Sequence, residues 1–182
     1  MARLPYVDPA TAPEQVRELL DRLPVKLNVF RMMAHATTDF RPLVGLGSAI
    51  LGRQKLSPKL RELAILRVAA LSPARYEWVQ HVPIAESTGV TTAQVEALER
   101  GDADAACFDE LERLVLRFTT EVVRDVRASQ ATFDALLARL SAQEMVELVL
   151  AVGYYMMIAR LLETTAVDLE PARGHEILRS LR

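Results

Sequence analysis

The chain has little cysteine, little glycine and few aromatic residues. Its 182 residues include one cysteine, Cys107, only 7 glycines and 5% aromatic side chains. A single cysteine excludes an intrachain disulfide and any Cys-x-x-Cys redox pair. Alanine and leucine outnumber the β-branched and aromatic residues, which favours helices over sheets. The composition therefore predicts an all-α fold, and the length fits one domain over residues 1–182.

An excess of positive charge is also missing, since the formal net charge is -2. Nonspecific nucleic-acid affinity comes mainly from lysines and arginines that neutralise phosphates, so we expect no nucleic-acid partner. The first residues lack the apolar stretch of a secretory signal. The longest uncharged apolar run, residues 148–159, is too short to span a bilayer. We expect a soluble, cytoplasmic protein with no membrane partner.

Helix caps and breakers divide the chain into helical segments. Ser57-Pro58 and the capping-box patterns that begin at Thr91 and Ser141 mark helix starts, and Gly89 marks a helix end. The polar segment 171–182 is expected to be a peripheral tail with a short helix near 175–181. The other expected helices cover residues 11–23, 27–35, 38–53, 57–71, 74–88, 91–100, 108–126, 130–140 and 142–164.

Glu77 and His81 are four residues apart in one of these helices. At that spacing two side chains share a helix face, about 5–6 Å apart at Cβ, so a carboxylate can orient an imidazole and tune its basicity. The alternatives are a solvated surface pair and a histidine satisfied within the core. A metal site is only weakly indicated, because the pattern supplies two ligands and no second histidine lies nearby.

Glu62 lies inside an apolar run, between Ile65 and Leu66 on the helical wheel. A buried carboxylate must be paired, hydrogen-bonded or neutralised, and a perturbed carboxyl near a histidine is a candidate for acid-base chemistry. The alternative is a structural ion pair with Arg67 or Arg160.

Residues 84–95 also resemble a DNA-binding helix-turn-helix, with a glycine in the turn and a capped second helix. The second helix carries Glu96 and Glu99, and Arg100 is its only basic residue. Because phosphates require positive charge, this pattern argues against DNA binding.

The apolar helix expected over 142–164 contains two adjacent tyrosines, Tyr154 and Tyr155. Either hydroxyl could donate to a ligand, and packing in the core is the alternative role.

Three short stretches, taken in order, resemble the carboxymuconolactone decarboxylase family, which includes the AhpD-like alkylhydroperoxidases. They are LRELAILRV at 60–68, YEW at 76–78 with His81, and GV at 89–90. The resemblance is best over residues 40–125. It implies an all-α AhpD-like helical bundle that assembles as trimers or hexamers, with a pocket near the subunit contacts.

In the peroxidase branch of that family, a Cys-x-x-Cys-x-x-x-His motif and an upstream glutamate form a thiol proton relay. Aligning the histidine of that motif with His81 places Ala74 and Glu77 at the two cysteine positions and Glu62 at the upstream glutamate. The thiols are absent, so a dithiol peroxidase cycle is excluded.

The decarboxylase branch needs neither thiol, cofactor nor metal, and the resemblance implies a small organic acid or lactone as substrate. We expect His81 to act as general acid and base, Glu77 to orient it, and Glu62 to serve as a relay or second acid. The candidate substrate-binding residues are Arg61, Arg67, Arg160, Tyr155 and Trp78. The alternatives are an AhpD-like protein without dithiol activity and a noncatalytic ligand-binding or assembly protein.

Overall fold

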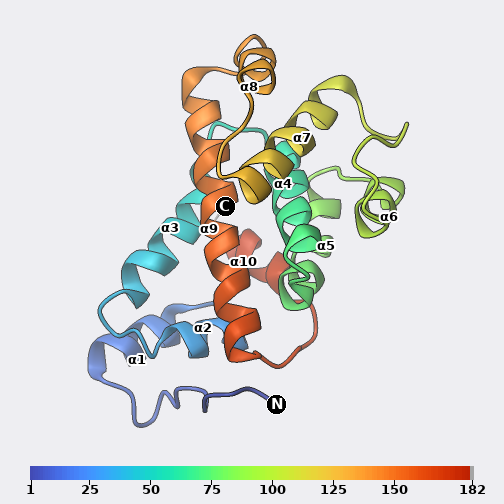
Figure 1. Cartoon of the computed structure of the whole chain (residues 1–182). Coiled ribbons are helices and arrows are strands. Elements are labelled where there is room, and N and C mark those ends of the chain that lie inside the picture. Colours follow the sequence, from blue (N-terminus) through green and yellow to red (C-terminus); the bar gives the residue numbers. More distant parts are fainter. Residues whose placement is uncertain (181–182) are drawn as a thin grey trace.

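The computed structural model describes residues 1–180, and these residues form helices with no β-strand among them (Figure 1). The all-α prediction is confirmed. The helices are α1 (Glu14–Arg22), α2 (Asn28–Met33), α3 (Phe40–Arg53), α4 (Pro58–Leu71), α5 (Arg75–Ser87), α6 (Thr92–Glu99), α7 (Glu110–Asp125), α8 (Gln130–Leu137), α9 (Ala142–Thr165) and α10 (Gly174–Ser180).

Local capping chemistry sets several of these boundaries. The predicted capping boxes at Thr91 and Ser141 are present, each with the reciprocal pair of hydrogen bonds that defines the motif. A third box at Asp109, which the sequence analysis missed, begins α7. Gly89 follows α5 with a φ of 98°, a conformation that glycine adopts without steric cost.

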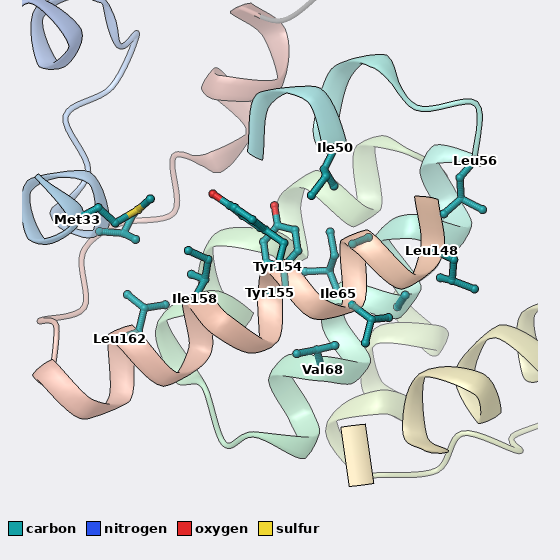
Figure 2. Close-up of a cluster of buried hydrophobic side chains, with 14 of the residues drawn as sticks. Met33, Ile50, Leu56, Ile65, Val68, Leu148, Tyr154, Tyr155, Ile158 and Leu162 are labelled. Atoms are coloured by element: carbon teal, nitrogen blue, oxygen red, sulfur yellow. The ribbon is translucent and has the colours of Figure 1, made fainter. Parts of the chain in front are cut away.

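The middle of the bundle is α4, which packs against α5, α7 and α9. Every residue from Leu60 to Ala69 is buried, so this helix has no solvated face. Figure 2 shows side chains of α9, among them Tyr155 and Ile158, in one apolar cluster with Ile65 and Val68 of α4. A helix that is covered on all sides must pair its own charged groups internally.

Among the described residues, α9 is the one helix long and apolar enough to cross a membrane. Core helices of globular proteins pass the same test. One side of α9 is buried and packs against α3, α4, α7 and α8, including Leu148, Val152 and Leu162. This burial identifies α9 as a core helix of the bundle.

The C-terminal segment is not peripheral, contrary to the sequence-based expectation. After α9 the chain turns back, and α10 packs against α5 (Figure 1). The Gln80 side chain accepts hydrogen bonds from the backbone N–H groups of Arg173 and Gly174 and donates one to the carbonyl of Pro171. Polar composition concealed this docking because the contacts are made largely by the backbone. Residues 181 and 182, which were included in the expected tail, lie outside the described residues.

Candidate functional site

A largely apolar pocket lies among α2, α3, α5, α9 and α10. Its cavity volume, counted as the space that the centre of a water-sized sphere can occupy, is about 100 Å³. One buried water needs roughly 10–15 Å³ by this measure, so the space suits a small organic molecule. The residues of its wall that carry polar side-chain atoms are Ser48, Tyr76, Glu77, Gln80, His81, Tyr154 and Tyr155.

His81 is held in the pocket wall by Glu62 of α4. The His81 Nδ1 atom lies 2.9 Å from Glu62 Oε2, and the Arg61 Nε–H donates to Glu62 Oε1 at 3.1 Å. All three residues are buried. An ionised carboxylate only accepts hydrogen bonds, so Nδ1 is then the donor and Nε2 is the ring nitrogen left for a ligand.

The expected pairing of Glu77 with His81 is wrong. Neither carboxyl oxygen of Glu77 has a hydrogen-bond partner among the described residues, although the residue is only 2% exposed. Glu62 orients His81 instead, because α4 and α5 pack side by side and bring positions 62 and 81 together. Helical spacing placed Glu77 on the same face as His81 but could not reveal a closer partner on the next helix.

Burial raises the pKa of Glu77 well above its ordinary value, and the negative charge of Glu163 raises it further. A carboxyl group without a donor or cation nearby is more stable in its neutral form. The surroundings of Glu77 therefore favour its uncharged carboxylic acid form.

The tyrosines of α9 form the next part of the wall. The ring of Tyr155 meets the His81 ring edge to face, with 4.7 Å between centroids. The Tyr155 hydroxyl makes no hydrogen bond to any residue in 1–180, whereas the Tyr154 hydroxyl donates to the Leu43 carbonyl at 3.1 Å. Burial raises the pKa values of both phenols, so both stay protonated at neutral pH.

The other predicted substrate-binding residues lie elsewhere. Arg61 donates to Glu62, Arg67 donates to Thr120 Oγ1 and to the Gly101 carbonyl, and Arg160 is exposed. Trp78 packs in a second apolar cluster on the other side of α5. None of these four lines the pocket, which corrects the expectation that they contact a substrate there. The structural pairing of Glu62 with Arg67 or Arg160 is also wrong, since its partner is Arg61.

Sequence reasoning missed Gly174 and Ile177, the residues of the C-terminal segment that line the pocket, and the contacts that hold this segment in place. Glu170 accepts hydrogen bonds from the Tyr76 hydroxyl and from the backbone N–H of Asn28. These bonds join the segment after α9 to α2 and α5, next to pocket residues Gly174 and Ile177. The acceptor lies more than ninety positions from either donor in the sequence, so no local pattern could indicate the contact.

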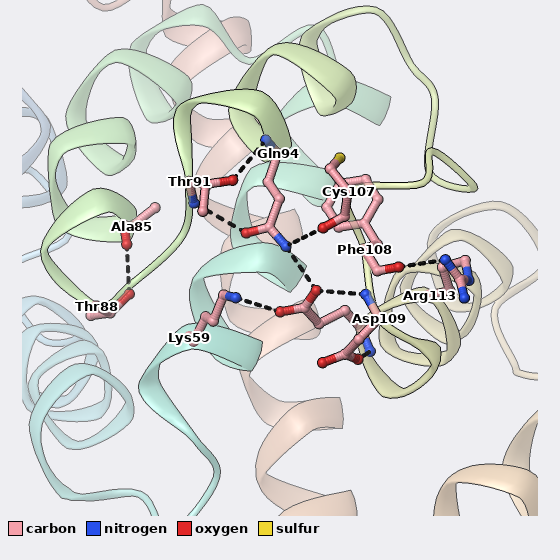
Figure 3. A network of polar contacts seen from close by, with 10 residues as sticks. Lys59, Ala85, Thr88, Thr91, Gln94, Cys107, Phe108, Asp109 and Arg113 are labelled. Carbon is pink, nitrogen blue, oxygen red and sulfur yellow. Dashed lines mark hydrogen bonds and ion pairs between the residues drawn. The ribbon is translucent and has the colours of Figure 1, made fainter.

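A second buried polar network lies away from the pocket (Figure 3). Glu112 accepts from Gln94 Nε2 at 2.7 Å and pairs with Lys59 Nζ at 2.6 Å. Gln94 also donates to the backbone carbonyl of Cys107, whose exposed thiol is not part of the pocket wall. Every polar group here has a partner, so the network ties α6 to α4 and α7. Among the described residues, no group of three or more His, Cys, Asp and Glu side chains could hold a metal ion.

Residues 40–121 match the model of the carboxymuconolactone decarboxylase family. A search of curated protein sequences finds no significant match.

Similar solved structures share the fold over nearly the whole chain. An uncharacterized peroxidase-related protein with an AhpD core from Ralstonia eutropha JMP134 is 20% identical, with a TM-score of 0.79 over 97% of this chain and 95% of that one. A peroxidase-related protein from Silicibacter sp. TM1040 is 18% identical, with a TM-score of 0.76 over 93% and 92% of the two chains.

A cysteine-to-alanine variant of the debrominase Bmp8, bound to 2,3,4-tribromopyrrole, is also similar. It is 18% identical, with a TM-score of 0.76 over 100% of both chains. At such identities these structures establish a shared fold and do not assign an activity.

Proposed function

We propose that this chain, whose residues 40–121 match the carboxymuconolactone decarboxylase family and whose fold is that of AhpD-like proteins, is a cofactor-free enzyme that transfers protons at a small organic acid or lactone. The observation that carries the proposal is the buried hydrogen bond between His81 Nδ1 and Glu62 in the wall of an apolar pocket. A histidine held in one orientation by a carboxylate is a common general acid and base.

In this proposal His81 works through Nε2. Glu62 fixes the ring and stabilises the imidazolium that forms when Nε2 takes a proton. Arg61 limits the negative charge on Glu62 through its 3.1 Å hydrogen bond. Glu62 is thus a positioning residue and His81 the catalytic one.

A decarboxylation would use the same proton donor. When a substrate carboxylate leaves as CO₂, the electron pair of the broken bond stays on carbon, and that carbon takes a proton from protonated His81. This reaction needs neither a metal nor a thiol. The single cysteine of the chain lies outside the pocket, in keeping with a mechanism without thiol chemistry.

The second candidate is a noncatalytic ligand-binding protein. The apolar wall of the pocket favours it, since such a wall suits binding as well as catalysis. A protein of this kind would bind small apolar molecules and leave them unchanged.

A screen for turnover and hydrogen exchange distinguishes the enzyme from the noncatalytic binding protein. Purified protein is incubated in D₂O with lactones and organic acids, and product formation and deuterium incorporation are followed by NMR. We expect exchange or turnover that His81→Gln lowers by at least about a hundredfold, the range of general acid-base catalysis. The matched control is His35→Gln, which alters an exposed histidine that is not part of the pocket wall. Activity that is unchanged in His81→Gln would remove the assignment.

The proposal also includes self-association in the cytoplasm, as a trimer or hexamer. The exposed apolar side chains of α9, among them Val146, Val149 and Leu150, support an interface between copies of the chain.

A further inference from the structure

Two side chains of the pocket carry hydrogen-bond donors that the described protein does not use. We propose that Glu77 and Tyr155 donate hydrogen bonds to the carbonyl oxygen of an uncharged, apolar substrate held beside His81. The inference rests on the proposed function, because it takes His81 as the acid-base group. It adds the substrate class and two further residues.

Glu77 is the first donor. It is 2% exposed, lines the pocket, and has no partner for either carboxyl oxygen among residues 1–180. No lysine or arginine is among the described residues of the pocket wall, which leaves His81 as the group there that can carry a positive charge. The raised pKa of Glu77 agrees with a neutral acid that keeps its O–H. An unpaired buried donor is costly, and a ligand that accepts its hydrogen bond removes that cost.

Tyr155 is the second donor. Its hydroxyl has no hydrogen bond within the described residues, while its ring packs against His81. The neighbouring Tyr154 offers a direct contrast, because its hydroxyl is already bound to the Leu43 carbonyl. Only Tyr155 of this pair has an O–H left for a ligand.

The charged groups of the pocket wall indicate whether the substrate is an organic acid or a lactone. A carboxylate anion would lose its hydration in an apolar pocket whose described wall holds no lysine or arginine, because the Arg61 guanidinium binds Glu62 and does not line the pocket. A lactone, ketone or ester carries no charge and needs only donors for its carbonyl oxygen. The pocket therefore favours the neutral carbonyl compound.

The hydrogen-bond donors of Glu77 and Tyr155 also fit a proton transfer by His81. His81 Nε2 takes a proton from the carbon next to the carbonyl, and the C–H electron pair becomes the C=C bond of an enolate. The π pair of the carbonyl moves onto oxygen, where Glu77 and Tyr155 donate hydrogen bonds to the growing charge. Return of the proton from His81 to the same or a conjugated carbon restores the neutral state.

Three probes with the same number of non-hydrogen atoms test the charge and acceptor preference by calorimetric titration. Acetophenone is a neutral carbonyl compound, α-methylstyrene replaces its oxygen by a CH₂ group, and benzoate is an anion. We expect acetophenone to bind at least about tenfold tighter than benzoate and about fivefold tighter than α-methylstyrene, the worth of one to two hydrogen bonds.

Variants then assign the donors. Tyr155→Phe and Glu77→Leu should each lower the preference for acetophenone over α-methylstyrene by about two- to threefold. Glu77→Gln keeps an N–H donor and should retain most of it. Tyr154→Phe is the matched control for Tyr155→Phe and should leave the preference unchanged, because its hydroxyl is bound to Leu43.

Infrared difference spectra provide a readout that a purely structural role would not give. We expect a protonated carboxylic acid band that disappears in Glu77→Gln and shifts when acetophenone binds. No measurable acetophenone binding, equal or tighter binding of benzoate, or an ionised Glu77 would each overturn the inference. Failure of the proposed function would give a different result. Acetophenone would then bind with the expected preference, but no exchange that depends on His81 would occur.

Discussion

At position 62, one glutamate serves two buried partners. Its oxygens separately accept from Arg61 Nε and contact His81 Nδ1, and its side chain is 0% exposed. Arg61 is 2% exposed, and its Nη2 atom has no partner among the described residues. The site thus depends on a charge balance inside the core.

Glu62→Gln should destabilise the protein by about 3–5 kcal/mol, because it leaves the Arg61 charge buried without its counter-ion. Urea unfolding followed by circular dichroism, at fixed protein concentration, measures the change. The double variant Arg61→Met with Glu62→Gln removes that charge and should regain part of the loss. If the double variant is no more stable than Glu62→Gln, an uncompensated charge is not the cause.

Glu77→Gln should stabilise the protein increasingly as pH rises. Because the folded-state pKa of Glu77 is raised above 4.5, the folded protein keeps a proton that the unfolded chain releases. The free energy of unfolding of the wild type therefore falls with pH, from the ordinary pKa up to the raised one. The advantage of Glu77→Gln should grow by up to about 1.4 kcal/mol per pH unit above the ordinary pKa and level off above the raised one.

Urea titrations at several pH values give this difference. The control Glu86→Gln changes an exposed glutamate on the same helix and should show no such trend. A constant difference between Glu77→Gln and wild type would mean that Glu77 is ionised in the folded protein.

At the scale of elements, the approach of α3 to α9 places Tyr154. A Cβ atom at Gly47 would lie 2.6 Å from the Tyr154 hydroxyl oxygen, so only glycine lets this tyrosine reach the Leu43 carbonyl. Gly45, two residues earlier on α3, has no atom within 4 Å of the point where a Cβ would lie. Gly45 and Gly47 therefore have different roles.

Gly47→Ala should destabilise the protein by about 1–3 kcal/mol through overpacking and displace Tyr154. Gly45→Ala should instead stabilise it by up to about 1 kcal/mol, because alanine is the better helix former. Thermal unfolding of the two variants side by side measures both effects. Equal changes in the two variants would show that the contact with Tyr154 does not constrain position 47.

At the scale of the whole molecule, α9 is buried on one side and exposes apolar side chains on the other. The exposed set is Val146, Val149, Leu150 and Met157, which recur at helical spacing. Exposed apolar stripes of this kind often mark contacts between protein copies. This face is the structural basis for the proposed self-association.

Val149→Arg should lower the molar mass measured by light scattering after gel filtration from an oligomer to a smaller species, with helicity unchanged. A charge placed in an apolar contact costs desolvation that the free surface does not. Leu169→Arg, at another exposed apolar residue outside α9, serves as the control. A wild-type chain that is monomeric at micromolar concentration would contradict the proposal.

Local chemistry in the sequence determined most of the helices. The caps at Thr91 and Ser141 and the breaker Gly89 act within a few residues, so they could be found without a structure. The single cysteine likewise excluded dithiol chemistry by composition alone. Glu62, His81 and Tyr155 were identified as candidates from their residue types and apolar surroundings.

Only the tertiary structure decided which of these residues meet. Glu62 and His81 are 19 positions apart on two helices, and Gln80 binds backbone groups more than ninety positions away. Such contacts depend on how helices pack, which helical periodicity does not encode. Helix packing therefore paired His81 with Glu62, left the Glu77 carboxyl without a hydrogen-bond partner among the described residues, and brought Gly174 and Ile177 into the pocket wall.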